Sequence, residues 1–342
     1  MKKINDKGFT LIEILVSLAI LGIVLAGIYS VYTMQHKSYI VQEQVANMQQ
    51  NERVALQMIT RDIRMAGLGL QFCNNAAGGK VIFSDGVNNY NGFGNDDSDR
   101  IAVEYHSFSP TAGGETELTA DILLTAASTN LDVKGTADFA DGDWVMVIDG
   151  GGDCHYALFC VTNVLPAALR HINANGGSCA NKATYGNNLA TGFRIGDRVR
   201  RLNREDGGNI IYAINDNYQL TRSVDSAAAQ PLADNIEDMQ IAYGIDINGD
   251  GVVAPDDGDG IVEIGEEWFN DPAGRDMTLL REIRVTLVAR TTREDPAYNA
   301  GIRPQIEDHA PATNTTTEVK YRRRVLQSTI KLRNIDATVA MF

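Results

Sequence analysis

The sequence predicts an α+β fold in which one long N-terminal helix lies against an antiparallel β-sheet. An apolar run extends from Phe9 to Val31 and contains a single charge, at Glu13. An amphipathic stretch with helical spacing follows from Tyr39 to Ala66. Beyond residue 70, short β-rich runs alternate with clusters of Gly, Asn and Asp. The helical signal therefore comes first along the chain, and the strand signals follow it.

The apolar run is long enough to cross a membrane. Its 23 residues would form a helix of about 34 Å, against a hydrocarbon core of about 30 Å. Before it, Lys2, Lys3 and Lys7 outnumber Asp6, so the extreme N-terminus is predicted to be cytoplasmic and the remainder extracytoplasmic.

An ordinary secretory signal peptide is the alternative interpretation of this run. Its apolar region would be only about 7 to 15 residues long. The observed run is longer, and it contains Glu13, whose unpaired carboxylate would cost roughly 3 kcal/mol inside a membrane. A retained helix in which this acid has a functional role is therefore favoured.

The amphipathic stretch predicts that the helix continues beyond the membrane. Its apolar positions recur at steps of three, four or seven: Val41, Val45, Met48, Ala55, Ile59, Ile63 and Ala66. No proline interrupts it. A helix from Phe9 to about Ala66 would be roughly 87 Å long at about 1.5 Å per residue. Gly67 and Gly69 are expected to end it.

The strands are expected in the remaining chain. The predicted segments are Lys80 to Phe83, Arg100 to Tyr105, Trp144 to Asp149, Tyr156 to Val164, Ile210 to Ile214, Met239 to Ile245, and about Tyr321 to Leu332. The clearest alternation places Ile283, Val285, Leu287 and Ala289 on one face, which is typical of a half-buried antiparallel strand. Residues 72–200 are expected to be a large loop-rich insertion.

The residues KGFTLIE, from Lys7 to Glu13, resemble the class III signal of type IV pilins and pseudopilins. The resemblance implies that prepilin peptidase cuts between Gly8 and Phe9, that Phe9 becomes N-methylated, and that Glu13 serves subunit docking. Phe9 and Glu13 are four residues apart, so a new α-amino group could pair with the carboxylate on one helical face. The amine could also belong to a neighbouring subunit.

Further segments resemble PilW-type minor pilins. They are MAGLGL from Met65, PLADNIEDMQIAYGIDINGDG from Pro231, REIRVTLVART from Arg281 and YRRRVLQSTIKLRN from Tyr321. The resemblance implies a pilin-like fold divided into a leader (1–8), a transmembrane or filament-core helix (9–32), an amphipathic half of the stem helix (33–70) and a β-rich head (71–342).

The resemblance also implies function and location. The chain would be a structural, non-enzymatic minor pilin that helps to initiate or cap a type IV pilus. Its expected partners are other minor and major pilins, prepilin peptidase and the inner-membrane assembly platform. It would cross the inner membrane once with its head in the periplasm, then reach the pilus, at its tip. The alternatives are a J-like pseudopilin of type II secretion and a pilin-anchored, calcium-dependent adhesin.

The segment DINGDGVVAPDD, residues 246–257, is the local motif with the clearest chemistry. It offers oxygen ligands at EF-hand spacing, from Asp246, Asn248, Asp250, the Val252 carbonyl and Asp257, with Gly251 at the sharp turn. Asp257 stands where an EF-hand has Glu, as in dockerin-type loops. The sequence therefore predicts a calcium site, and a solvated acidic turn is the alternative.

Four cysteines occur in the chain: Cys73, Cys154, Cys160 and Cys179. An extracytoplasmic location favours disulfides, with three possible connectivities. We expect Cys154 to pair with Cys160 and Cys73 with Cys179. A zinc site that uses Cys154, His155 and Cys160 is the alternative.

Other functions find little support in the sequence. The formal net charge of −14 disfavours broad binding to nucleic acids or anionic membranes, and no nucleic-acid partner is expected. The basic run Arg198, Arg200, Arg201 and Arg204 could be a phosphate patch, but alternation on a strand beside acidic residues is the commoner explanation. No GxSxG, HExxH or P-loop motif occurs.

Overall fold

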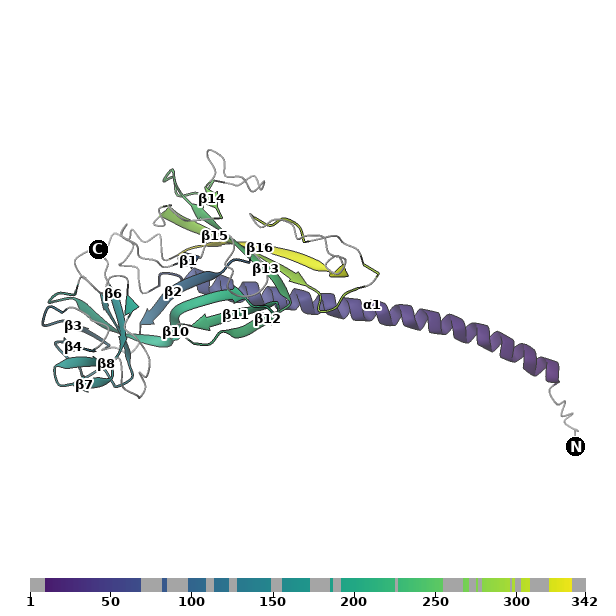
Figure 1. Ribbon diagram of the computed structural model, residues 1–342, viewed down its shortest axis with the longest axis horizontal. Helices are drawn as coiled ribbons and strands as arrows, with labels where there is room; N and C mark the ends of the chain where they lie inside the picture. Colours follow the sequence, from purple (N-terminus) through teal and green to yellow (C-terminus); the bar gives the residue numbers. More distant parts are fainter. Residues whose placement is uncertain are drawn as a thin grey trace, which may run out of the picture.

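The long N-terminal helix is the dominant element of the structure, a computed structural model (Figure 1). The described residues are 10–68, 82–84, 98–108, 114–122, 128–148, 156–172, 185–186, 192–224, 227–254, 267–270, 275, 279–295, 297–298, 303–307 and 320–333. Helix α1 (Leu11–Met65) contains 55 residues and is about 82 Å long. Its N-terminal half projects away from the β-rich head (Figure 1).

The predicted continuous helix is confirmed. Neither Gly22 nor Gly27 interrupts it. At its end the Ala66 N–H donates to the Ile63 carbonyl at 3.1 Å, and Gly67 has a φ of 77°. That conformation favours glycine because a Cβ would be strained there, so the first of the two predicted glycines terminates the helix.

The strands follow in chain order: β1 (Ile82–Ser84), β2 (Ile101–Phe108), β3 (Glu115–Glu117), β4 (Ser128–Asp132), β5 (Trp144–Ile148), β6 (Tyr156–Cys160), β7 (Asn163–Leu165), β8 (Ala168–Ile172), β9 (Tyr185–Gly186), β10 (Arg198–Ile214), β11 (Gln219–Val224), β12 (Gln230–Asp234), β13 (Ile236–Ile245), β14 (Trp268–Phe269), β15 (Leu280–Arg290) and β16 (Arg323–Lys331). The pairings among these strands are antiparallel, as predicted.

The described strands of the head form three sheets. A nine-stranded sheet has the order β1-β2-β10-β5-β6-β9, with β3 and β11 also paired to β10, and β12 paired to β11. A four-stranded sheet has the order β14-β13-β15-β16, and a three-stranded sheet the order β4-β8-β7. Helix α1 packs against β15 and β16 of the four-stranded sheet and against β2 and β12 of the nine-stranded sheet.

Strand β10 joins two parts of the head. Its first residues, Arg198 to Leu202, pair with β5, and its last residues, Ile210 to Ile214, pair with β11. The register against β2 shifts between Asn203 and Gly208. One strand of 17 residues thus passes from the end of the head farthest from the helix N-terminus to the sheet that covers α1 (Figure 1).

The core beside the helix, which we term the stem-side core, confirms the predicted stripe. Met48, Ala55, Ile59, Ile63 and Ala66 are all buried in it. The alternating apolar face of β15 meets them there, with Ile283, Val285, Leu287 and Ala289 each at most 1% exposed. Burial of this stripe is the main apolar contribution to holding the helix on the head.

A second core, termed the distal core, lies within the segment expected to be a loop-rich insertion. It includes Leu118, Leu131, Phe159 and Leu169. Strand β5 is shared: Trp144, Met146 and Ile148 enter the stem-side core, whereas Val145 and Val147 enter the distal core. The described part of residues 72–200 is therefore an organised β-structure: several of its strands were predicted, but a core shared among them was not.

The other predicted strands fall largely where expected, with two exceptions. Tyr156 to Val164 divides into β6 and β7, and the strand predicted for Ile210 to Ile214 is the end of β10, which begins at Arg198. Lys80 and Val81 of the earliest predicted strand lie outside the described residues.

Candidate functional site

The N-terminal turn of α1 forms a capping box around Glu13. The Glu13 carboxylate accepts hydrogen bonds from the Thr10 backbone N–H at 2.9 Å and from the Thr10 hydroxyl at 2.8 Å. The Thr10 hydroxyl oxygen in turn accepts from the Glu13 N–H at 3.4 Å. These reciprocal bonds satisfy backbone donors that the start of a helix would leave without partners.

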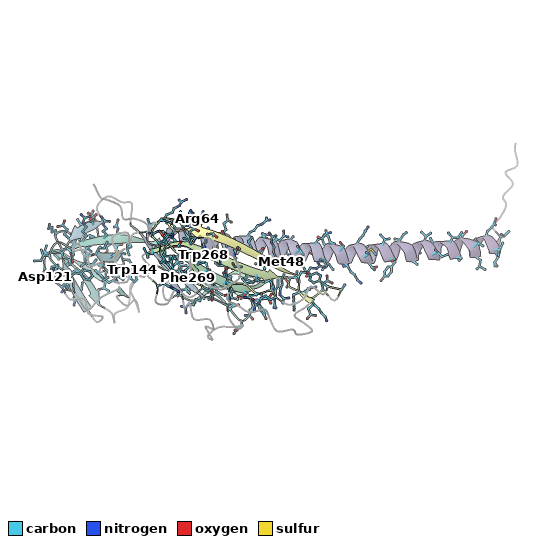
Figure 2. All side chains as sticks on the ribbon, turned by 90° about the horizontal axis from the view of Figure 1, so that it is seen from above. Met48, Arg64, Asp121, Trp144, Trp268 and Phe269 are labelled. Carbon is cyan, nitrogen blue, oxygen red and sulfur yellow. The ribbon has the colours of Figure 1, made fainter. Side chains whose placement is uncertain are left out.

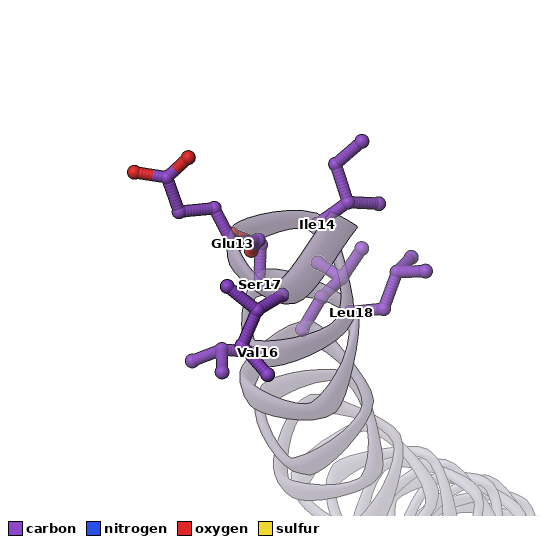
Figure 3. Close-up of a pocket in the computed structure, with 7 residues that line it drawn as sticks. Glu13, Ile14, Val16, Ser17 and Leu18 are labelled. Carbon is purple, nitrogen blue, oxygen red and sulfur yellow. The ribbon is translucent and has the colours of Figure 1, made fainter. Parts of the chain in front are cut away.

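Apolar side chains surround this acid on the exposed helix. Glu13 and Ser17 share a surface hollow of about 620 Å³ with apolar neighbours that include Ile12, Val16 and Leu21. Figure 3 shows the Glu13 carboxylate pointing outward from the first turn, with Ile14 and Leu18 on another flank of the helix. A single charged group therefore marks an otherwise largely apolar surface.

The first half of α1 has no cover from the described part of the chain. Every residue from 10 to 32 is exposed, and Ile23, for example, retains 75% of its accessible surface. This segment makes α1 the one described helix that is long and apolar enough to cross a membrane. So large an exposed apolar surface indicates burial in lipid or against other subunits.

Of the three residues predicted from the pilin-type signal, only Glu13 lies in the described residues. Gly8 and Phe9 fall outside them, so the cleavage, the methylation and the pairing of the Phe9 amine with Glu13 stay predictions. Thr10 was missed as a partner of Glu13, although the spacing Thr-x-x-Glu is the sequence signature of a capping box.

A buried acid fixes the second half of α1 to the head. Asp62 is 3% exposed. It accepts hydrogen bonds from the Tyr105 hydroxyl at 3.0 Å, the Tyr212 hydroxyl at 2.6 Å and the Arg222 Nε at 3.0 Å. Burial, with the Asp62 charge as the next cause, raises the pKa of Tyr105 to about 12, and the same causes raise the pKa of Tyr212. Both tyrosines therefore remain donors at neutral pH.

Glu52 is a second buried acid on the same side of the helix. It is 0% exposed, and neither carboxylate oxygen has a hydrogen-bond partner. Arg324 of β16 forms an ion pair with it, at 3.2 Å from Nε to Oε2. Burial raises the pKa of Glu52 to about 7, although Arg324 and Arg53 both act to lower it. Its protonation state therefore changes close to physiological pH.

The predicted calcium loop folds into a compact turn. Asp246 is 1% exposed and accepts from the Gly249 N–H at 2.8 Å and the Gly251 N–H at 3.0 Å. Asn248 and Asp250 each accept the N–H two residues further on, both at 2.8 Å. The predicted sharp turn at Gly251 is present, with a φ of 83°.

Other residues already bind part of this loop. Buried Glu267 accepts the N–H groups of Ile247, Asn248 and Ala254 at 2.7 to 3.2 Å, and Arg281 lies 3.5 Å from Asp246. Asp257 lies outside the described residues. Among the described side chains, no group of three or more His, Cys, Asp or Glu is arranged to hold a metal ion. Calcium binding stays a prediction.

Cys160 is the one cysteine within the described residues. It lies at the end of β6, 0% exposed, and it takes part in a disulfide bond. Cys73, Cys154 and Cys179 lie outside the described part of the chain, so the connectivity stays a prediction.

The basic residues of β10 pair with acids, in agreement with the strand interpretation. Glu115 of β3 lies 3.6 Å from Arg198 and 3.2 Å from Arg200, and Arg201 lies 3.7 Å from Asp143. Nothing is described of the Arg204 side chain.

Comparison with known proteins gives a family match at each end of the chain. Residues 3–29 match the prokaryotic N-terminal methylation motif, and residues 205–334 match the family of Type IV Pilus-assembly protein W. No curated protein matches the sequence. Among solved structures, the type IV-like pilin TTHA1219 from Thermus thermophilus matches at 10% identity with a TM-score of 0.21, over 56% of this chain and 84% of that one. The two family matches support the resemblance to PilW-like type IV pilins.

Proposed function

We propose that the chain is a minor pilin of a type IV pilus that helps to initiate or cap pilus assembly. The observation that carries this proposal is the division of α1 into an exposed apolar half and a half packed on a β-rich head. The apolar half supplies a surface that lipid covers before assembly and other pilins cover afterwards. The bulky head is more compatible with a few copies at the tip than with the abundant subunit.

The proposed maturation follows from the N-terminal motif. Prepilin peptidase would cut between Gly8 and Phe9, and the new N-terminus at Phe9 would be methylated. The Glu13 carboxylate, surrounded by apolar side chains, would then accept a charged amine from its own chain or from a neighbouring pilin. In a medium of low dielectric such a pair offsets the cost of burying the acid.

Replacing Glu13 by Gln tests this role of the charge. Gln also completes a capping box with Thr10, so the helix start is retained while the charge is lost. We expect incorporation into pili to fall at least about tenfold. Without the Glu13 charge the amine has no counter-ion in the apolar surroundings, and this changes the free energy of docking by a few kcal/mol. The matched control is Glu43→Gln, at an exposed acid further along α1. Normal incorporation of the Glu13 variant would contradict the docking role.

Deletion of the gene separates the proposed function from its alternatives. We expect fewer pili by electron microscopy, restored when the gene is supplied again. Normal pili together with a loss of protein secretion would indicate a J-like pseudopilin. Normal pili with a loss of surface attachment would indicate an adhesin, for which the distal core offers a separate structural unit at the far end of the head.

We also propose calcium as a structural ligand of the 246–257 loop, supported by the oxygen-rich turn at Asp246, Asn248 and Asp250. The calcium ion would only need to neutralise the negative charge of the carboxylates within the turn. Calorimetric titration of the full chain in detergent should show a Kd of about 10⁻⁴ to 10⁻³ M. Asp250→Ala should abolish the heat, whereas Asp216→Ala, at an exposed turn, should preserve it. No heat and no shift in melting temperature with the unaltered chain would remove calcium from the proposal.

A further inference from the structure

A groove of about 870 Å³ lies between the last turns of α1 and the edge strand β16. Four arginines line it: Arg53, Arg61 and Arg64 from the helix, and Arg333 from the residues after β16. None of the described residues that line it is acidic. Figure 2 places Arg64 at the surface of the molecule beside β16, which is drawn in yellow. We call this feature the arginine groove.

The helix separates its charges between two faces. Glu52 directly precedes Arg53 in the sequence, and Asp62 directly follows Arg61. Both acids are nevertheless buried against the head. The arginines are exposed on the other side. Asp62 is bound to the Tyr105–Tyr212–Arg222 group and Glu52 forms its ion pair with Arg324. Glu52 also acts on Arg53 through its charge, but neither acid lines the groove.

Three of the groove's arginines have no ion-pair partner among the described residues. Arg53, Arg61 and Arg333 form no hydrogen bond or ion pair among residues 10–68, 320–333 and the other described segments. Elsewhere in the head, buried arginines such as Arg303 and Arg323 are paired with Asp238 and Glu237. A concentration of positive charge is also unexpected in a chain of net charge −14, so it points to an anionic ligand.

The groove is lined by apolar atoms as well as by charges. Val54 is 40% exposed, and Leu326 of β16 and Met58 of the helix line the groove beside it. A surface that combines exposed aliphatic side chains with guanidinium groups is suited to a segment that carries both carboxylates and apolar residues. A small hydrophilic anion would leave the apolar part uncovered.

The location of the groove disfavours a lipid headgroup. Val31 ends the apolar run, and Arg53 lies 22 residues further along the same helix, which corresponds to about 33 Å. The electrostatic reach of a membrane surface is only about 8 Å at physiological ionic strength. The groove instead lies on the flank of the head, where β16 is the terminal strand of its sheet.

From these observations we propose that the arginine groove binds an acidic, partly apolar segment of a neighbouring pilin subunit. The identity of the neighbour rests on the proposed function; the acidic and apolar character of the segment follows from the groove itself. The groove would thus give the head a specific lateral contact, in addition to the packing of apolar helices.

Photo-crosslinking of the full chain in pilus-producing cells tests this proposal. A photoreactive amino acid replaces Val54 in the groove or, as a matched control, Val325, which is 43% exposed and does not line the groove. The crosslinked peptides are identified by mass spectrometry. We expect the Val54 probe, and not the Val325 probe, to capture one defined segment of another pilin subunit that contains Asp or Glu.

Charge reversal then tests the role of the arginines. With the Val54 probe in place, Arg53→Glu combined with Arg61→Glu should lower the crosslinking yield about tenfold. Arg170→Glu combined with Arg194→Glu, which changes the charge equally at exposed sites outside the groove, should leave the yield unchanged. Replacing the captured acids of the partner by Lys should restore the yield to the doubly reversed chain.

The proposal is overturned by equal yields at Val54 and Val325, by capture of a phospholipid or nucleic acid, or by a captured segment without acids. An unchanged yield after charge reversal also overturns it, provided that the variant chain has a normal melting temperature. The proposed function fails separately, if deletion of the gene leaves pilus number unchanged. If pilus number depends on the chain but the Val54 probe captures nothing, the groove proposal alone is overturned.

Discussion

The two halves of α1 belong to one continuous helix but have different surroundings. Between residues 10 and 32 every residue is exposed, and the apolar side chains have no partner in the described chain. Between Met48 and Ala66 the apolar stripe is buried in the stem-side core. The comparison teaches that the first half depends on surroundings outside the described chain, whereas the second half packs on specific residues of the head.

Each half also contains a distinctive acid. Glu13 is bound only by Thr10 of its own turn, so its apolar surroundings can come from outside the chain. Asp62 is bound by three groups of the head. Substitutions in the two halves should therefore separate effects on assembly from effects on the stability of the head.

The largest expected effect is from Asp62→Ala. It leaves two buried tyrosine hydroxyls and the Arg222 guanidinium without their acceptor, which should lower the free energy of unfolding by about 3 to 5 kcal/mol. Urea unfolding of the full chain in detergent, followed by tryptophan fluorescence of Trp144 and Trp268, measures this. Arg61→Ala, at the exposed neighbouring position, is the control and should change stability by less than about 0.5 kcal/mol. Equal effects of the two variants would contradict the anchoring role of Asp62.

A matched pair of isoleucines compares the halves directly. Ile59 is 0% exposed and Ile20 is 57% exposed. Ile59→Ala should cost about 3 kcal/mol of unfolding free energy because it leaves a cavity in the stem-side core. Ile20→Ala should leave head stability within about 0.5 kcal/mol of the unaltered chain. The same urea titrations check both values, and a comparable loss in both variants would mean that the apolar half contributes to folding of the head.

A smaller effect is expected from Glu52 and depends on pH. Its pKa is about 7 in the folded chain against an ordinary value of 4.5, so the folded state binds a proton more tightly than the unfolded state between these pH values. Stability from this group is present below about pH 4.5 and is lost as the pH rises through about 7. On the order of 2 kcal/mol should be lost between pH 5 and pH 8 relative to Glu52→Gln.

Unfolding titrations of the unaltered chain and of Glu52→Gln at several pH values check the role of Glu52. The charged groups nearest to Glu52 are Arg324 and Arg53, and Arg324→Gln should raise its pKa further and steepen the dependence. Parallel pH profiles for the unaltered chain and Glu52→Gln would refute this account.

The sequence was sufficient for the helix and for most of the longer strands. A 3.6-residue period or strict alternation is a local signal, so the stripe through Ile59 and the face of β15 through Val285 could be assigned without tertiary information. The class III signal was likewise local, and the match of residues 3–29 agrees with it.

The polar contacts of the stem could not be assigned in the same way. Asp62 and Glu52 fall at helical spacing within the buried stripe, between Met48, Ala55, Ile59 and Ala66. An acid at such a position is a signal that could have been noticed. The partners of Asp62 lie 43 to 160 residues away in the chain: Tyr105, Tyr212 and Arg222. Only the assembled sheet brings them together.

The distal core was missed for a related reason. Its residues come from short strands between β3 and β10, and turn-forming residues surround them. The predicted strand begins only at Ile210, whereas β10 begins at Arg198 and continues past Gly208 with a shift in register. Length and composition of single segments do not reveal which of them share a core.

The continuity of β10 has a mechanical consequence. A pull on the distal end of the head would travel along this strand's own backbone toward the sheet that covers the helix. The ladders to β2, β5 and β11 run along the strand, so many hydrogen bonds would bear the load together in shear rather than break one after another. The covalent backbone of β10 thus connects the two cores of the head directly.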